Sequence, residues 1–229
     1  MSFSLIVPAA AHKTEYNECM PRVFRLNAKG FALCVEAVMG LNLQQFSAIY
    51  FTILRQHDER YGIAAMLRIQ LDRAGLGCAK IVVLEAPTSS QAETIFRTID
   101  KEQITGPVFI KDADSSFTVD VIPRNGLVVF PLEKLSQVNP QHKSYVAVDD
   151  MQFVTNFIEK RVIDHYFNAG GYCFEEAQTF VAYYRQYCNQ SGLYLSHIVY
   201  AMLLDRYIFR PFFAEKYEDF EMIYPNDKK

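Results

Sequence analysis

The chain has 229 residues, of which 50% are hydrophobic and 21% are charged, and this composition is typical of a globular protein rather than a disordered one. The formal net charge is -3, whereas a nucleic-acid-binding domain usually carries an excess of positive charge, so we expect no nucleic-acid partner. No apolar run approaches the roughly 18 to 20 residues that span a bilayer, and the first residues lack the positively charged start of a secretion signal.

The first half of the chain alternates strand-like and helix-like segments. Apolar runs predict strands at Leu5–Val7, Phe46–Leu54, Ala79–Leu84 and Val108–Lys111, and helical spacing predicts helices at Gly30–Leu41, Ala64–Ala74 and Ser90–Asp100. Strands that alternate with helices at this spacing indicate a mostly parallel sheet covered on both faces.

The second half changes to shorter strand-like pieces, followed by two helical segments and a last apolar element. Strands are expected at Phe117–Ile122, Gly126–Phe130, Tyr145–Asp149, Val154–Ile158, Ile163–Phe167 and Gly170–Phe174, helices at Glu175–Cys188 and Leu195–Asp205, and the last element at Ile208–Phe213. No linker divides the chain, so we expect residues 1–229 to form one domain in which the second half extends the first.

The five cysteines are scattered, odd in number and never in Cys-x-x-Cys spacing. This distribution argues against a disulfide framework and against a zinc site. Unpaired thiols in a cytoplasmic protein are its simplest explanation.

The fourth predicted strand runs directly into two carboxylates, Asp112 and Asp114. The strand delivers them to the carboxyl edge of the sheet, where open α/β folds bind ligands. An unpaired charge beside a buried strand is costly, and Mg²⁺ is a common partner because it takes one or two carboxylates plus substrate phosphates. The same residues can also begin an ordinary turn.

Further segments follow in a recognisable order: Ile6–Ala10, Met20–Val23, Thr88–Thr94, Pro107–Phe117, Phe157–Lys160, Asn168–Phe174, Tyr194–His197 and Tyr217–Phe220. Together they resemble the sugar-phosphate nucleotidyltransferases of the nucleotide-diphospho-sugar transferase fold. The resemblance covers nearly the whole chain. It implies a three-layer α/β/α fold with a mixed, mostly parallel central sheet, a nucleotide-binding half at residues 1–114, and a sugar- or acceptor-binding half at residues 115–229.

The resemblance also implies a role for individual residues. It assigns the nucleotide to Pro8, Ala9, Ala10, Ala11, Lys13, Gln91 and Asp112, the catalytic cations to Arg22 and Lys160, the acceptor to Glu159 and Gly171, and Mg²⁺ to Asp114 and Asp219.

One loop departs from the family pattern, which is rich in glycine and carries an arginine. Here the corresponding residues are Ala11, His12, Lys13, Thr14 and Glu15. Glycine reaches positive φ and lets the backbone approach a phosphate closely, which alanine and lysine do not do cheaply. Glu15 falls where a phosphate-binding arginine is expected, and its charge repels phosphate.

Several assigned residues have a simpler interpretation beside the functional one. Asp219 lies in an acidic stretch of the kind that usually faces solvent, and Lys160 could pair with Glu159. Gln91 could belong to the first turn of a helix, and the Gly170-Gly171 pair could mark a bulge. Lys13 stands in a loop, where basic residues commonly face solvent, whereas Pro21 and Val23 pin the position of Arg22.

Nucleotidyl transfer is the function that these expectations favour: Mg²⁺-dependent transfer from a nucleoside triphosphate to a sugar phosphate or similar small phosphate, for surface-polysaccharide synthesis. One alternative is a glycosyltransferase on the same fold, in which Asp112 and Asp114 hold the metal of a nucleotide-sugar. Another is a non-catalytic nucleotide- or sugar-binding homologue, which the altered loop favours. A homo-oligomer is compatible with the aromatic pairs Tyr183-Tyr184 and Phe212-Phe213, which suit a core or an interface.

Overall fold

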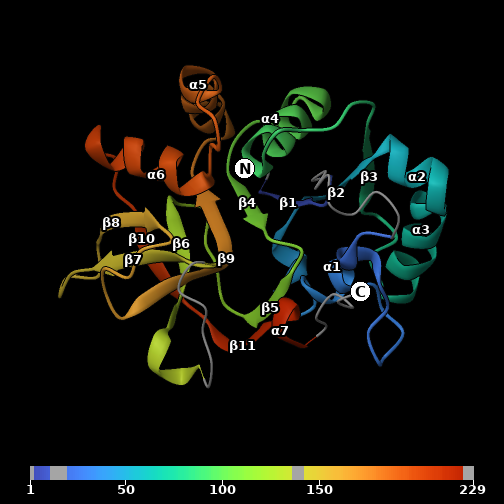
Figure 1. Ribbon diagram of the computed structural model, residues 1–229, viewed down its shortest axis with the longest axis horizontal. Helices are drawn as coiled ribbons and strands as arrows, with labels where there is room; N and C mark the ends of the chain where they lie inside the picture. The colour runs from blue at the N-terminus through green and yellow to red at the C-terminus, as the bar shows by residue number, and fades with distance from the viewer. Residues whose placement is uncertain (1–2, 11–19, 136–141, 224–229) are drawn as a thin grey trace.

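The computed structural model describes residues 3–10, 20–135 and 142–223 (Figure 1). Its strands are β1 (Ser4–Pro8), β2 (Ala48–Leu54), β3 (Lys80–Leu84), β4 (Val108–Lys111), β5 (Ser115–Thr118), β6 (Gly126–Pro131), β7 (Ser144–Val148), β8 (Val154–Glu159), β9 (Tyr166–Phe174), β10 (Arg210–Phe213) and β11 (Glu215–Asp219). Its α-helices are α1 (Leu33–Glu36), α2 (Arg55–Tyr61), α3 (Ile63–Arg73), α4 (Gln91–Glu102), α5 (Ala177–Tyr187), α6 (Leu195–Leu204) and α7 (Phe220–Ile223).

The described strands form a 9-stranded sheet and a separate two-stranded one. The main path of the large sheet has the order β10-β6-β9-β4-β1-β2-β3. All its strands run in one direction except β9, which is antiparallel to both β4 and β6. β7 and β8 extend this sheet beside β9, and β11 pairs with β5 in the small sheet. The predicted mixed, mostly parallel sheet is therefore confirmed.

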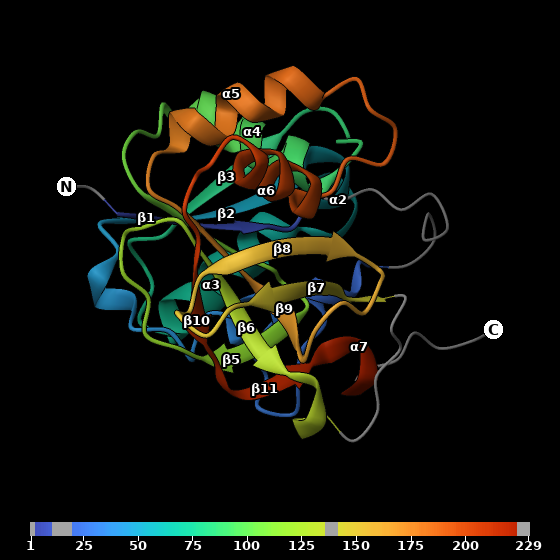
Figure 2. The same cartoon turned by 90° about the vertical axis from the view of Figure 1, so that its left-hand side faces the viewer.

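Apolar side chains alternate between two cores, one on each face of the large sheet. On β1, Leu5 and Val7 face a core that includes α1 and α3, whereas Ile6 faces the core built with α4, α5 and α6. Figure 2 shows α4, α5 and α6 together on one side, and β5, β11 and α7 on the other. Burial on both faces explains why the central strands read as continuous apolar runs, and it confirms the three-layer architecture.

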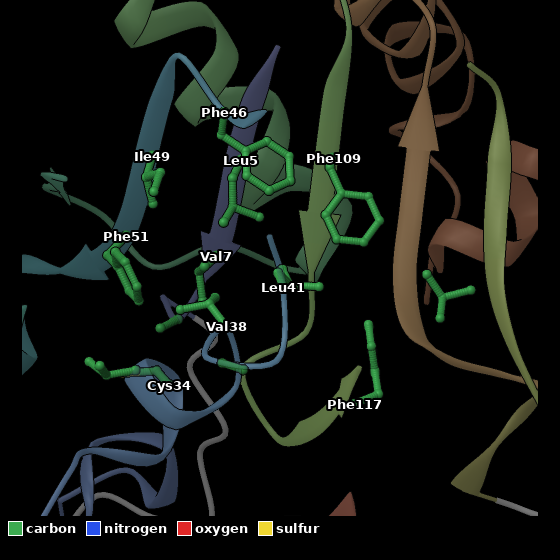
Figure 3. Close-up of a cluster of buried hydrophobic side chains, with 14 of the residues drawn as sticks. Leu5, Val7, Cys34, Val38, Leu41, Phe46, Ile49, Phe51, Phe109 and Phe117 are labelled. Atoms are coloured by element: carbon green, nitrogen blue, oxygen red, sulfur yellow. The ribbon is translucent and has the colours of Figure 1, made fainter. Parts of the chain in front are cut away.

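The first of these cores fills the space beneath the centre of the sheet (Figure 3). Leu5 and Val7 of β1 meet Phe51 of β2 and Phe109 of β4, and all four side chains are almost completely buried. Phe117 of β5 joins the same cluster. Because β4 and β5 are both anchored here, the residues between them, which include Asp112 and Asp114, are held at both ends.

Some predicted elements have different bounds in the structure. The helix expected over Gly30–Leu41 is reduced to α1, and the strand expected over Phe117–Ile122 is β5, which begins and ends earlier. The two strands expected between Ile163 and Phe174 form the single strand β9, which crosses Gly170 at a φ of +96°. The polar residues after β2 form α2, a helix that apolar periodicity did not reveal.

Among the described residues, no helix has both the length and the apolar character that crossing a membrane requires.

Candidate active site

The turn from Lys111 to Ser115, called here the carboxylate turn, joins β4 to β5 at the carboxyl edge of the sheet. Lys111 has no exposed surface, and its ammonium lies inside the turn. It donates to the backbone oxygens of Asp112 at 2.6 Å and Ser115 at 2.8 Å, and to Ser115 Oγ at 3.1 Å. Its charge also lies 4.4 Å from the centre of the Phe117 ring. Lys111 therefore fixes the shape of the turn that carries both carboxylates.

Asp112 is half-buried between α4 and β9. Gln91 Nε2 donates to its Oδ1 at 2.5 Å, and its backbone N–H donates to Gly170 O at 2.8 Å. A Cβ on Gly170 would lie 2.9 Å from Asp112 Cβ, so only glycine allows this approach. Burial, and then the neighbouring charge of Asp114, raise the pKa of Asp112 to about 6. The structure thus brings together Gln91 and Asp112, the two residues that the family resemblance assigns to the nucleotide.

Asp114 and Asp219 also come together, although they are far apart in sequence. The pairing of β5 with β11 places Asp219 opposite Ser115, and Phe220 N donates to Asp114 O at 2.9 Å. Desolvation in this crowded turn raises the pKa of Asp114, and the charges of Glu221 and Asp219 add to the rise. Its side chain nevertheless retains access to solvent, so the carboxylate can be reached by a ligand.

Lys143 lies at the start of β7 and points to this pair of carboxylates. Its Nζ donates to Asp219 Oδ2 at 2.5 Å and to the hydroxyl oxygen of Tyr217 at 2.6 Å. The side chains of Lys143 and Asp219 are only 14% and 18% exposed, so the ion pair is largely shielded from water. Sequence reasoning did not identify Lys143 or Lys111 as site residues, because their roles depend on contacts that no local motif encodes.

Arg22 reaches the same region from the short 3-10 helix Arg22–Phe24. Its guanidinium forms a salt bridge with Glu221 of α7 at 3.1 Å, and Glu221 follows Asp219 by two residues. The structure therefore brings Arg22 close to the predicted metal-binding carboxylates, while Glu221 carries a further negative charge to which the sequence analysis assigned no role.

The donor set fits Mg²⁺ in part. Among the residues that the structure describes, no group of three or more His, Cys, Asp or Glu side chains could hold a metal ion. Mg²⁺ nevertheless binds to as few as two carboxylates when substrate phosphates provide the other ligands of its coordination shell. Two carboxylates that converge and repel one another suit such a site. Asp114 and Asp219 meet this description, because the charge of Asp219 raises the pKa of Asp114.

The second group of predicted residues lies where β8 ends against α6, and is called here the β8 end. Glu159 Oε2 accepts hydrogen bonds from Ser144 Oγ at 2.5 Å and from Ser196 Oγ at 2.8 Å, which ties β7, β8 and α6 together. Lys160 is exposed and donates to the Tyr194 hydroxyl at 2.9 Å. Its φ of 59° lies in the left-handed region that favours glycine, and such backbone strain is common at functional sites.

The two groups are joined through the backbone, since Lys160 N donates to Lys143 O at 2.9 Å. Gly171 lies on β9 opposite Lys111. A Cβ there would meet Val128 Cγ2 at only 2.4 Å, so close packing against β6 already accounts for this glycine.

The remaining predicted residues belong to the segment after β1. Pro8 ends β1, and Ala9 and Ala10 are buried beside it, with Ala9 N donating to Thr52 O at 2.8 Å. Ala11 and Lys13 lie outside the described residues.

No protein-family model matches the sequence, and no curated protein matches it. The fold is nevertheless similar to that of several solved structures. One is the nucleoside-diphosphate-sugar pyrophosphorylase from Vibrio cholerae RC9, with a TM-score of 0.73 and 18% identity over 91% of each chain. Another is the inositol-1-phosphate CTP transferase from T. maritima, with a TM-score of 0.73 and 14% identity over 96% of this chain and 89% of that one. A UDP-glucose pyrophosphorylase complexed with UDP-glucose has a TM-score of 0.66 and 11% identity over 94% of this chain and 92% of that one. The predicted fold is therefore confirmed.

Proposed function

We propose that this protein transfers a nucleotidyl group from a nucleoside triphosphate to a sugar phosphate or a similar small phosphate, with Mg²⁺ as cofactor. The observation that carries the proposal is the convergence of Asp114 and Asp219 at the carboxyl end of β4, on a fold similar to that of solved nucleotidyltransferases. The product would be an activated donor of the kind that surface-polysaccharide synthesis consumes.

In the proposed reaction, an oxygen of the acceptor phosphate forms a bond to the α-phosphorus of the triphosphate. The bond from the α-phosphorus to the bridging oxygen breaks, and pyrophosphate leaves with the electron pair. Such a displacement needs little covalent help from the protein, so catalysis depends on positioning and on positive charge. Mg²⁺, held by Asp114 and Asp219, would supply charge for the phosphates.

The chain's own residues would divide the remaining work. Arg22 can compensate the charge of the leaving pyrophosphate once its guanidinium exchanges Glu221 for phosphate, because a fork of donors suits phosphate oxygens. Gln91 and Asp112, which are joined by a hydrogen bond, are the candidates for binding the nucleotide. Lys160 is the candidate for binding the acceptor phosphate. Glu159 would position Lys160, because Glu159 fixes the end of β8 against α6.

A second candidate function is binding of a nucleotide or a sugar nucleotide without turnover. The specific observation in its favour is the sequence from Ala11 to Glu15, which has no glycine and places a negative charge where phosphate is expected. A glycosyltransferase on the same fold would bind nucleoside diphosphates and release no pyrophosphate.

A ligand panel separates these functions. We would measure thermal unfolding with each of five nucleoside triphosphates and with UDP and GDP, each with and without Mg²⁺. A ligand present at about 100 times its dissociation constant stabilises by about 2.7 kcal/mol, which is several degrees for a chain of this size. The stabilising triphosphate is then incubated with hexose 1-phosphates and inositol 1-phosphate, and pyrophosphate release is measured.

We expect a Mg²⁺-dependent shift with one triphosphate, and pyrophosphate release with one acceptor. A shift with diphosphates alone would favour the glycosyltransferase, whereas binding without pyrophosphate release from any pair would favour the non-catalytic function. No shift with any nucleotide would contradict the proposal.

A further inference from the structure

Lys143 is held more firmly than an ordinary surface lysine. Besides its bonds to Asp219 and Tyr217, its ammonium lies 5.4 Å from the centre of the Phe167 ring and 5.1 Å from that of the Tyr217 ring. The Phe167 ring, the Tyr217 hydroxyl and the Asp219 carboxylate therefore surround a single charge. This environment replaces much of the water that a free ammonium would bind, and cation–π contacts strengthen when water is excluded.

The partner of this lysine is the carboxylate that we assign to the metal. Asp219 Oδ1 accepts from the backbone N–H of Glu221 at 2.8 Å, while Oδ2 accepts from Lys143. Both oxygens of the carboxylate are thus engaged by groups of the chain itself, which fix its geometry.

The charge of Lys143 acts beyond Asp219: burial raises the pKa values of Asp112 and Asp114, and the ammonium opposes part of that rise. The ammonium consequently offsets the repulsion among three carboxylates, as a bound divalent cation would. A cation that binds Asp219 through Oδ2 must either share this oxygen with the ammonium, at the cost of repulsion between two positive charges, or displace it.

We propose that Lys143 is a built-in counter-ion that occupies Asp219 in the absence of metal and is displaced from Oδ2 when a divalent cation binds. The inference rests on the proposed function to the extent that Asp219 is taken as a metal ligand. It adds a residue that sets metal affinity and whose ammonium is released next to the phosphates only after the metal has arrived. Its neighbour through the backbone is Lys160, so the released charge would lie beside the predicted acceptor site.

In the first test, the nucleotide-free protein is titrated with Mn²⁺, a spectroscopically convenient substitute for Mg²⁺. Calorimetry measures the Mn²⁺ affinity, and thermal unfolding measures the stabilisation by Mn²⁺. We compare the wild type with Lys143→Met and with the matched control Lys134→Met. Lys134 is an exposed lysine whose ammonium lies 5.9 Å from the Phe130 ring, so the control removes the same charge from a nearby aromatic contact.

Lys143→Met is expected to bind Mn²⁺ about tenfold more tightly than the wild type, because the competing ammonium is gone and linked binding equilibria typically change an affinity about 5- to 150-fold. It is also expected to unfold at a lower temperature in EDTA and to gain more from Mn²⁺. Lys134→Met should match the wild type. Equal or weaker Mn²⁺ binding by a folded Lys143→Met, or no Mn²⁺ binding by either protein, would overturn the proposal.

The second test needs no variant and separates displacement from a mere electrostatic effect at a distance. Acetylation of individual lysines by an amine-reactive ester is followed by mass spectrometry with and without saturating Mn²⁺. Labelling of Lys143 should rise severalfold with Mn²⁺, while labelling of Lys134 stays constant. An unchanged rate at Lys143 would overturn the proposal even if the variant binds metal more tightly.

Neither test contains a nucleotide or measures turnover. A protein that passes both tests but releases no pyrophosphate would refute only nucleotidyl transfer. A protein that turns over normally but fails both tests would refute only the role of Lys143.

Discussion

The carboxylate turn and the β8 end hold their charged residues in opposite ways. In the turn, the buried ammonium of Lys111 contacts three oxygens, and the flanking strands are anchored in the core. At the β8 end, Lys160 is exposed and its side chain has a bond to Tyr194, which is itself 41% exposed. The carboxylate turn is therefore fixed before any ligand binds, whereas the side chain of Lys160 at the β8 end can adapt.

The largest effect is expected at Asp114, the carboxylate of the fixed side that we propose as a metal ligand. Asp114→Asn removes one of two converging charges but keeps the size of the side chain. We expect kcat to fall by a factor of roughly 10² to 10³, the loss typical of one preorganised electrostatic contact. Pyrophosphate release at saturating Mg²⁺ measures it. The control is Asp120→Asn, an exposed aspartate beyond β5, which should leave kcat unchanged; a similar loss in both variants would argue against a metal role for Asp114.

The next effect concerns stability rather than turnover. Lys111→Met fills the same space without a charge, but leaves two buried backbone oxygens without their donor. We expect unfolding to become easier by about 3 kcal/mol, because breaking a buried charged network costs several kcal/mol. Urea denaturation measures the change, and Lys134→Met should lie within about 0.5 kcal/mol of the wild type, as surface substitutions usually do. A stability of Lys111→Met equal to that of the wild type would show that the turn does not depend on this lysine.

A smaller and more selective effect is expected at the adaptable side. Lys160→Met should raise the KM for the acceptor phosphate about 10- to 100-fold, since a hydrogen bond to a charged group is worth about 1.5–3 kcal/mol. The KM for the triphosphate and the unfolding temperature should stay the same. Arg161→Met, which removes the neighbouring exposed charge, serves as control. If both KM values rose together, Lys160 would not be specific to the acceptor.

The smallest effect is a dependence of stability on pH. Because the pKa of Asp112 is raised to about 6 in the folded protein, the native state binds this proton more tightly than the unfolded chain. Stability without metal should therefore fall as pH rises from about 4 to about 6. Asp112→Asn removes this loss, so in EDTA it should be more stable than the wild type at pH 8 and equal to it near pH 4. Thermal unfolding across this range measures the difference.

A constant difference between Asp112→Asn and the wild type at all pH values would assign the effect to packing instead.

The sequence predicted best what is encoded locally. The four parallel strands of the first half are continuous apolar runs, and Asp112 and Asp114 follow one of them directly. The helix expected over Ser90–Asp100 is α4, at whose start Ser90 Oγ accepts from Glu93 N at 3.2 Å. Each of these features can be recognised from a few neighbouring residues.

What the sequence alone did not predict depends on contacts between distant segments. Lys143 precedes an ordinary strand, and only the pairing of β5 with β11 brings Asp219 within its reach. Lys111 reads as the polar end of a strand, although it is completely buried. Asp219 itself was expected only through a family resemblance, because its acidic surroundings are typical of a solvated surface.

The pairing of β5 with β11 also has a consequence for the order in which the molecule is made. Ser116 and Glu218, which face each other in this small sheet, are separated by 102 positions along the chain. During synthesis the first half can emerge and collapse while the strand that carries Asp219 is still missing, since domains begin to fold as the ribosome extends them. Contacts over such distances form late. A nascent chain would therefore hold Asp114 without Asp219 until β11 arrives, and would complete this pair of carboxylates in one late step.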